Sequence, residues 1–184
     1  MAMNPWKASE EVSDLVNEVC QKYHADRIQN ASIGVCFDES KPFVKNKLNL
    51  GKVTKFSPLA KLWQGTKLDF CISISMDLWH SVLTEEQREA FIDLQLSRCG
   101  VEYLPEEIEE NGKKKVIKDE FGRVQYTDVV KTDDDGNPKW IIRPLDLEVF
   151  SGNVRRYGLW YDELLEFKNA IIAPEDNDET AVDL

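Results

Sequence analysis

The sequence predicts an α+β fold in which a small β-sheet packs against helices. Residues 70–75 alternate apolar and small polar side chains with the period of a strand, and residues 9–27 repeat apolar side chains at the spacing of a helix. The segment Thr84-Glu-Glu-Gln87 is a capping box that begins a second helix. With 184 residues, 42% hydrophobic and 31% charged, the chain has the composition of a globular domain.

The first third of the chain contains the helix over residues 9–27, for which Ser9 is the predicted N-cap. Ile33–Phe37 is a predicted buried strand. Residues 39–66 contain two prolines and several lysines without a clear period, so we expect an extended, partly irregular connection with a strand near Val53. The apolar stripe of the first helix consists of Val12, Leu15, Val16, Val19, Cys20 and Tyr23.

The helix that begins after Thr84 should run to about Arg98. Turns at Asn111-Gly and Asp135-Gly separate three predicted strands of a polar β-insert, at residues 114–117, 124–130 and 140–143. Asp146 can cap a further helix, a last helix spans about residues 161–170, and the acidic tail 174–184 is predicted to be disordered. Residues 1–173 should therefore form one domain. The side chains expected to be buried by the helix after Thr84 are Ala90, Phe91, Leu94 and Cys99.

The charge and the cysteines limit the classes of function. Lys and Arg number 23 against 34 Asp and Glu, and a net charge of −11 repels DNA and anionic membranes. The sequence has no apolar run of about 18 residues, which a membrane span needs. The first residues have no apolar segment typical of a signal peptide, so we expect no secretion. The four cysteines form no CxxC pair and are expected to be reduced, mostly buried thiols: Cys20, Cys36, Cys71 and Cys99.

Common catalytic motifs are missing from the sequence. It has no GxxxxGK[ST] phosphate loop, no GxGxxG after a strand and no GxSxG nucleophile elbow. A histidine-dependent site would have to use His24 or His80, and each is interpreted as an ordinary surface or helix-end histidine.

Two segments nevertheless carry a family resemblance. The strand at residues 70–75 is followed by Asp77-Leu-Trp, Leu83-Thr-Glu-Glu-Gln-Arg-Glu-Ala90 and Asp93, and later come Leu145-Asp-Leu-Glu-Val-Phe150 and Val154-Arg-Arg-Tyr-Gly-Leu-Trp160. In this order they resemble the putative phage metallopeptidase family over residues 68–160. The resemblance implies a zincin-like fold, in which a helix carrying H-E-L-x-H supplies two histidine ligands and a glutamate base, and a later histidine completes a zinc site.

This sequence departs from the family pattern at every one of those positions. Leu94 and Arg98 stand at the two helix histidines, Gln95 at the glutamate and Leu145 at the later histidine. Leucine cannot coordinate zinc, glutamine is no base at useful pH, and the arginine cation opposes a dication. We therefore expect no catalytic residue, no metal and no cofactor here. Leu94 and Leu145 should pack together as core, and Arg98 should pair with Asp93 or Glu102.

The sequence is thus interpreted as that of a catalytically inactive, metallopeptidase-like phage protein that binds a host or phage protein in the host cytoplasm. Inhibition or modulation of a host defence protein is the expected role, without direct binding to nucleic acid or membrane. Open alternatives are an active hydrolase using His80, Cys99 and nearby carboxylates, an acidic DNA mimic, and a structural role in the particle. A vestigial cleft, if it survives, should be lined by Gln95, Arg98, Asp146, Arg155 and Tyr157.

Overall fold

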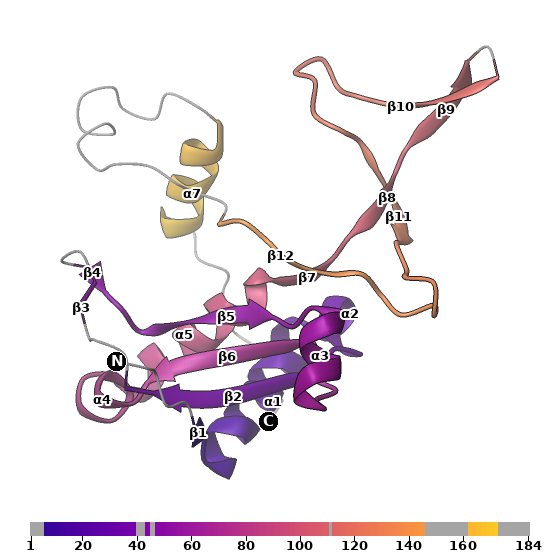
Figure 1. The fold of residues 1–184 in the computed structure, drawn as a ribbon. Coiled ribbons are helices and arrows are strands. Elements are labelled where there is room, and N and C mark those ends of the chain that lie inside the picture. The colour runs from indigo at the N-terminus through magenta and orange to yellow at the C-terminus, as the bar shows by residue number, and fades with distance from the viewer. Residues whose placement is uncertain (1–5, 40–42, 45–46, 111, 146–161, 173–184) are drawn as a thin grey trace, which may run out of the picture. The chain divides into compact units, whose positions relative to one another are not determined.

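The computed structural model describes residues 6–39, 43–44, 47–110, 112–145 and 162–172 (Figure 1). The chain divides into two compact units, residues 1–143 and 144–184. Within the second unit the described helix is α7 (Asp162–Ile172), which matches the predicted last helix. The predicted helix capped by Asp146 and the tail 174–184 lie outside the described residues, and the prediction of one domain over 1–173 stays a prediction.

The first unit is built on a four-stranded sheet with the order β1-β2-β6-β5. The central strands β2 (Ile33–Asp38) and β6 (Phe70–Ser75) are parallel, with Ile33 opposite Phe70. The outer strands β1 (Trp6–Lys7) and β5 (Gly51–Lys55) are antiparallel to their neighbours. The alternation seen in the sequence is that of the most buried strand: Phe70, Ile72 and Ile74 are at most 1% exposed.

Two helices cover the inward face of this sheet, α1 (Glu10–Tyr23) and α5 (Glu85–Arg98), which lie behind it in Figure 1. The capping box of α5 is confirmed, because the Thr84 hydroxyl accepts from the Gln87 amide and the Gln87 side chain accepts from the Thr84 amide. At the start of α1, Ser9 is the N-cap residue, but its side chain makes no capping hydrogen bond. The mixed α+β class is therefore confirmed. The core between helices and sheet includes Val12, Val16, Val19, Val35, Phe37, Val53, Phe70, Ile72, Ile74, Phe91, Ile92 and Leu96.

The buried side of α5 differs from the prediction. Ala90 and Leu94, which were expected to be buried, are exposed, whereas Ile92 and Leu96 are fully buried. The polar residue Gln95 lies within the buried stripe. Apolar periodicity alone therefore predicts the wrong buried face of α5, because it leaves out the buried polar residue Gln95.

The other short elements of the first unit refine the sequence expectations. The predicted helix over 9–27 breaks at His24, after which α2 (Ala25–Ile28) follows. The strand near Val53 is confirmed as β5, but the connection also contains α3 (Pro58–Gln64), whose N-cap Ser57 accepts from the Ala60 amide. A second short helix, α4 (Met76–Ser81), links β6 to α5. A small hairpin joins β3 (Phe43–Val44) and β4 (Lys47–Leu48).

Residues 99–142 form a β-arm of three successive antiparallel strand pairs (Figure 1). The three returning strands overlap those predicted for the β-insert: β10 (Lys113–Val116), β11 (Tyr126–Val130) and β12 (Trp140–Ile142). The outgoing strands were not predicted, because they are defined by their pairing with the returning strands: β7 (Cys99–Val101), β8 (Tyr103–Pro105) and β9 (Glu107–Glu110).

The environment of the cysteines also differs from the expectation. Cys99 is fully buried, but Cys20, Cys36 and Cys71 are half-buried, and all four are free thiols. Separately, none of the helices in the described ranges combines the length and the apolar character that crossing a bilayer requires.

Gly51, at the start of the edge strand, provides a test of the sheet. Its φ is +129°, and a Cβ there would lie 2.0 Å from the Ser73 carbonyl oxygen. Gly51→Ala should therefore lower the free energy of unfolding by about 3–5 kcal/mol. Gly65→Ala is the matched control, because its φ is also positive but nothing lies within 4 Å of a Cβ. It should cost only about 1–2 kcal/mol. Urea unfolding measures both values, and equal losses would contradict the crowding argument.

Candidate functional site

Gln95, which the sequence analysis matched to the glutamate of the family motif, is part of the structural core. Its side chain is 4% exposed, and its Oε1 accepts a 2.9 Å hydrogen bond from the backbone N–H of Val53 on β5. Because β5 is an outer strand of the sheet, this N–H has no neighbouring strand to bond with on that side. The glutamine therefore satisfies a buried donor, and it is not available to activate water.

The edge of β5 is engaged a second time by the β-arm. Lys55 Nζ donates a 2.8 Å hydrogen bond to the backbone oxygen of Trp140, and the Trp140 ring lies 5.7 Å from that of Phe70 in an edge-to-face arrangement. An extended peptide could add to a free edge as a further strand. Here α5 and β12 both contact that edge.

The two leucines at histidine positions are not core. Leu94 is 47% exposed and Leu145, which belongs to the second unit, is 45% exposed. Leu94 is therefore not part of the core of the first unit, whereas the prediction that it packs against Leu145 stays a prediction, because the two residues belong to different units. The reason for the exposure of Leu94 is the direction in which successive side chains point around a helix. Because Gln95 and Leu96 point toward the sheet, the neighbouring Leu94 points away from it.

The predicted ion pairs of Arg98 are also wrong. Asp93 pairs with His24, and Glu102 pairs with Lys131 and Lys139 on the β-arm at 2.7 and 2.6 Å. Hydrogen bonds from the two lysines lower the pKa of the Glu102 carboxyl. Arg98 is half-buried, and its Nε is buried without a hydrogen-bond partner in the described part of the chain.

His24 links the C-terminal end of α1 to the middle of α5. It is only 6% exposed, which corrects its interpretation as a surface residue, although it does stand at a helix end. Arg27 Nη2 donates to His24 Nδ1 at 2.9 Å, so the ring proton must be on Nε2, which donates to Asp93 Oδ1 at 2.7 Å. Since both ring nitrogens are engaged in the neutral ring, His24 is not free to bind a metal or transfer a proton.

The remaining candidates for non-standard metal chemistry lie apart from one another. Burial raises the pKa of the Cys99 thiol to about 12, so it stays protonated at neutral pH. His80 is exposed, and its ring lies 5.4 Å from that of Phe37. Within the described ranges, no group of three or more His, Cys, Asp or Glu side chains is arranged to hold a metal ion.

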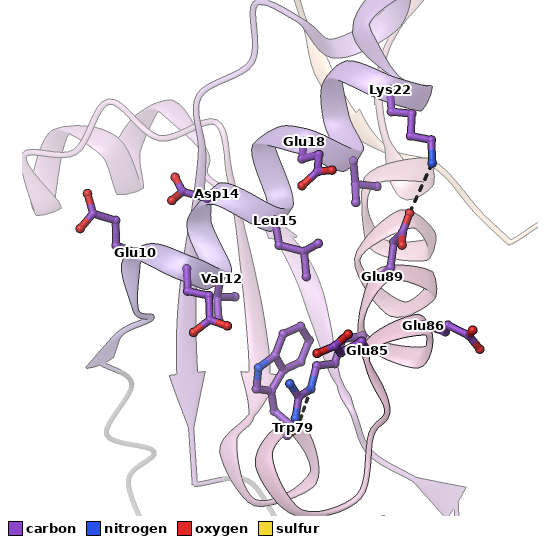
Figure 2. Close-up of a pocket in the computed structure, with 13 residues that line it drawn as sticks. Glu10, Val12, Asp14, Leu15, Glu18, Lys22, Trp79, Glu85, Glu86 and Glu89 are labelled. Carbon is purple, nitrogen blue, oxygen red and sulfur yellow. Dashed lines mark hydrogen bonds and ion pairs between the residues drawn. The ribbon is translucent and has the colours of Figure 1, made fainter. Parts of the chain in front are cut away.

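The structure instead contains a large acidic groove between α1 and α5, with a volume of about 780 Å³ (Figure 2). Trp79 of α4 lies between the two helices at its base, and Leu15 of α1 is its half-buried apolar residue. We call this feature the acidic groove, after the seven acids that line it: Glu10, Glu11, Asp14, Glu18, Glu85, Glu86 and Glu89.

The charge of the groove is strongly one-sided. Its lining holds these seven acids and two bases, Lys22 and Arg88. Lys22 Nζ lies 3.8 Å from Glu89 Oε1, while Arg88 Nε donates to the Trp79 carbonyl and its guanidinium lies 5.5 Å from the Trp79 ring centroid. The other six acids form no ion pair within 4 Å with any residue that the structure describes. The groove therefore offers an excess of negative charge along two helices.

Sequence reasoning did not find this groove. The acids of α1 and α5 were visible, but acids in the first turn of a helix also stabilise its dipole, so they do not indicate a site. What assembles them is the packing of two helices that are about 60 residues apart in the chain. Of the predicted cleft residues, Gln95 and Arg98 do not line the groove, while Asp146, Arg155 and Tyr157 lie outside the described residues.

Comparison with known proteins gives one match. The model of the family described as putative phage metallopeptidase matches residues 4–169. It confirms the resemblance seen at residues 68–160 and extends it toward both ends of the chain. No curated protein and no solved structure matches the chain.

The role of Gln95 can be tested by a pair of neighbouring substitutions. Gln95→Leu removes the acceptor and leaves the Val53 N–H buried and unpaired, so it should lower the free energy of unfolding by about 1–3 kcal/mol. Leu94→Ala is the matched control and should change it by at most about 0.5 kcal/mol, because Leu94 is half-exposed. Chemical denaturation measures both. A larger loss for Leu94→Ala would restore the hypothesis of an apolar core at this position.

Proposed function

This chain belongs to the putative phage metallopeptidase family, and we propose that it works by binding a partner protein rather than by hydrolysing peptide bonds. The acidic groove between α1 and α5 is the proposed binding surface. The proposed partner is a protein that presents a short basic segment, and the family's phage association supports a role in the host cytoplasm.

The loss of hydrolysis rests on how the motif positions are used. A zinc peptidase needs ligands with free lone pairs and a base that reaches the metal-bound water. Leu94 and Arg98 supply no such lone pair, and the Oε1 of Gln95 already accepts from Val53. The observation that carries this part of the proposal is the burial of Gln95 against the edge strand.

The choice of partner rests on charge and shape. Seven acids around two engaged bases attract a cationic segment, and complementary charge speeds association and selects against acidic partners. The α1 side of the groove runs from Glu10 to Lys22, a length of about 18 Å at 1.5 Å per residue. A helical segment of about 12 residues matches that length, with lysines and arginines toward the walls and an apolar side chain toward Leu15.

The DNA-mimic alternative shares this surface. Its occupant would be the basic groove of a nucleic-acid-binding enzyme, whereas a short basic segment needs the concave space between the helices. Competition separates the two. Displacement of this chain from its natural partner by DNA would support mimicry, whereas displacement by an added short basic peptide and not by DNA would support recognition of a basic segment.

Reversing charge inside the groove tests the proposed surface. A basic peptide of about 12 residues containing lysine, arginine and leucine should bind the full chain, with an affinity that falls as salt is added. The double variant Asp14→Lys, Glu18→Lys should bind about tenfold more weakly, because about 1.4 kcal/mol of attraction is lost. Both residues are exposed on α1 and line the groove. Isothermal titration calorimetry measures the affinities.

The matched control is Glu120→Lys, Asp128→Lys, which makes the same change in net charge on exposed positions of the β-arm. It should leave the affinity within about twofold. Equal weakening by both double variants would mean that the peptide responds to net charge alone, and the groove would lose its role. Cleavage of the peptide that a chelator stops and that His80→Ala abolishes would establish the hydrolase alternative instead.

A further inference from the structure

Two cysteines lie side by side on the sheet face opposite the helices. Cys36 of β2 alternates with Val35 and Phe37, and Cys71 of β6 alternates with Phe70 and Ile72, all of which point into the core. Their Sγ atoms are 3.6 Å apart, and both residues are half-buried. The two thiols thus form a pair that is reachable from solvent and separate from the acidic groove.

The strand register argues against a disulfide between them. Cys36 is opposite Ser73, two residues beyond Cys71 along β6. Two residues of strand cover about 6.6 Å and neighbouring strands are about 4.8 Å apart, so the two Cα atoms should be about 8 Å apart. Disulfides need Cα atoms within about 7 Å, and a bond here would require the backbone to move.

A bridging ion suits the same geometry without such movement. A tetrahedral ion with bonds of about 2.3 Å to two thiolates holds their sulfur atoms about 3.8 Å apart. The observed separation of 3.6 Å is within about 0.2 Å of that value. The Asp38 carboxylate, two residues from Cys36 on the same strand, raises the pKa of the Cys36 thiol, and the charge of a bound dication would offset this effect.

We propose that Cys36 and Cys71 form a two-thiolate binding site for a thiophilic divalent ion of the zinc and cadmium class. On binding, each thiol releases one proton to solvent and forms one bond to the ion, while water fills the remaining positions. The neighbouring hydroxyls do not complete the site, because Ser73 donates to the Lys52 carbonyl and Thr54 donates to the Cys71 carbonyl. This site is independent of the family's zinc motif and of the acidic groove.

Cadmium titration of the reduced, full-length chain tests the proposal. Thiolate-to-cadmium charge transfer absorbs in the ultraviolet, so binding should produce a band that saturates at one ion per chain. Cys36→Ser and Cys71→Ser should each abolish most of the band. Cys20→Ser is the matched control, since Cys20 is also half-buried but lies on α1, and it should leave the band unchanged.

Several results would overturn the site. A wild-type chain without the band would do so, as would a band that persists in the Cys36→Ser, Cys71→Ser double variant. A Cys36–Cys71 disulfide found by mass spectrometry after equilibration with oxidised glutathione would show that the register permits the bond. Should one serine variant fail to fold by circular dichroism, protection of both thiols from alkylation by bound cadmium in the wild type gives the same answer. None of these outcomes depends on peptide binding in the groove.

Discussion

The hydrogen bond between the Gln95 side chain and the Val53 amide is the contact on which the interpretation of this structure depends. It joins the middle of α5 to an outer strand of the sheet at a buried position, where an unpaired amide would cost about 1–3 kcal/mol. The bond lies on the side of α5 that faces the sheet, and the opposite side faces solvent. Phe91, Ile92 and Leu96 enter the core with Gln95, while Leu94 turns outward. Gln95, which the sequence analysis matched to the glutamate of the family motif, is thus a buried structural residue of this helix.

The parts of the fold that could be predicted from the sequence are those determined by near neighbours. The capping box involves four consecutive residues, and the alternation of β6 spans six. Both patterns can therefore be recognised in the sequence without knowledge of any tertiary contact. The parts that could not be predicted depend on distant partners. The side chain of Gln95 bonds to a residue 42 positions away, and that of His24 to a residue 69 positions away. The burial and the role of these two side chains therefore do not follow from the local sequence pattern. The outgoing strands of the β-arm are likewise defined by the returning strands that pair with them. The acidic groove belongs to this second class, because its walls come from helices that only the sheet brings together.

The two proposed binding surfaces, the acidic groove and the thiol pair, rely on different interactions. Each of them leaves the hydrophobic core unchanged. In the groove, the apolar contacts between α1 and α5 lie below the acids, so charged walls are placed on a scaffold that does not need them for packing. Long-range attraction is useful there because the groove is open to solvent and its acids are held by rigid helices. The thiol pair works at short range. It relies on the fixed spacing of two parallel strands, whose inward residues fill the core and whose outward residues are left for other uses.

A family scaffold can keep its fold after losing its metal only if the space and the buried polar groups around the former site are satisfied in another way. In this chain the buried amide of the edge strand is satisfied by Gln95, and Trp140 of the β-arm packs on Phe70 beside the same strand. Arg98 is less well satisfied, since its Nε is buried without a partner among the described residues. A bare zinc dication would be repelled by that guanidinium, so restoring single ligands at positions 94 or 95 would not recover a metal site while the arginine remains.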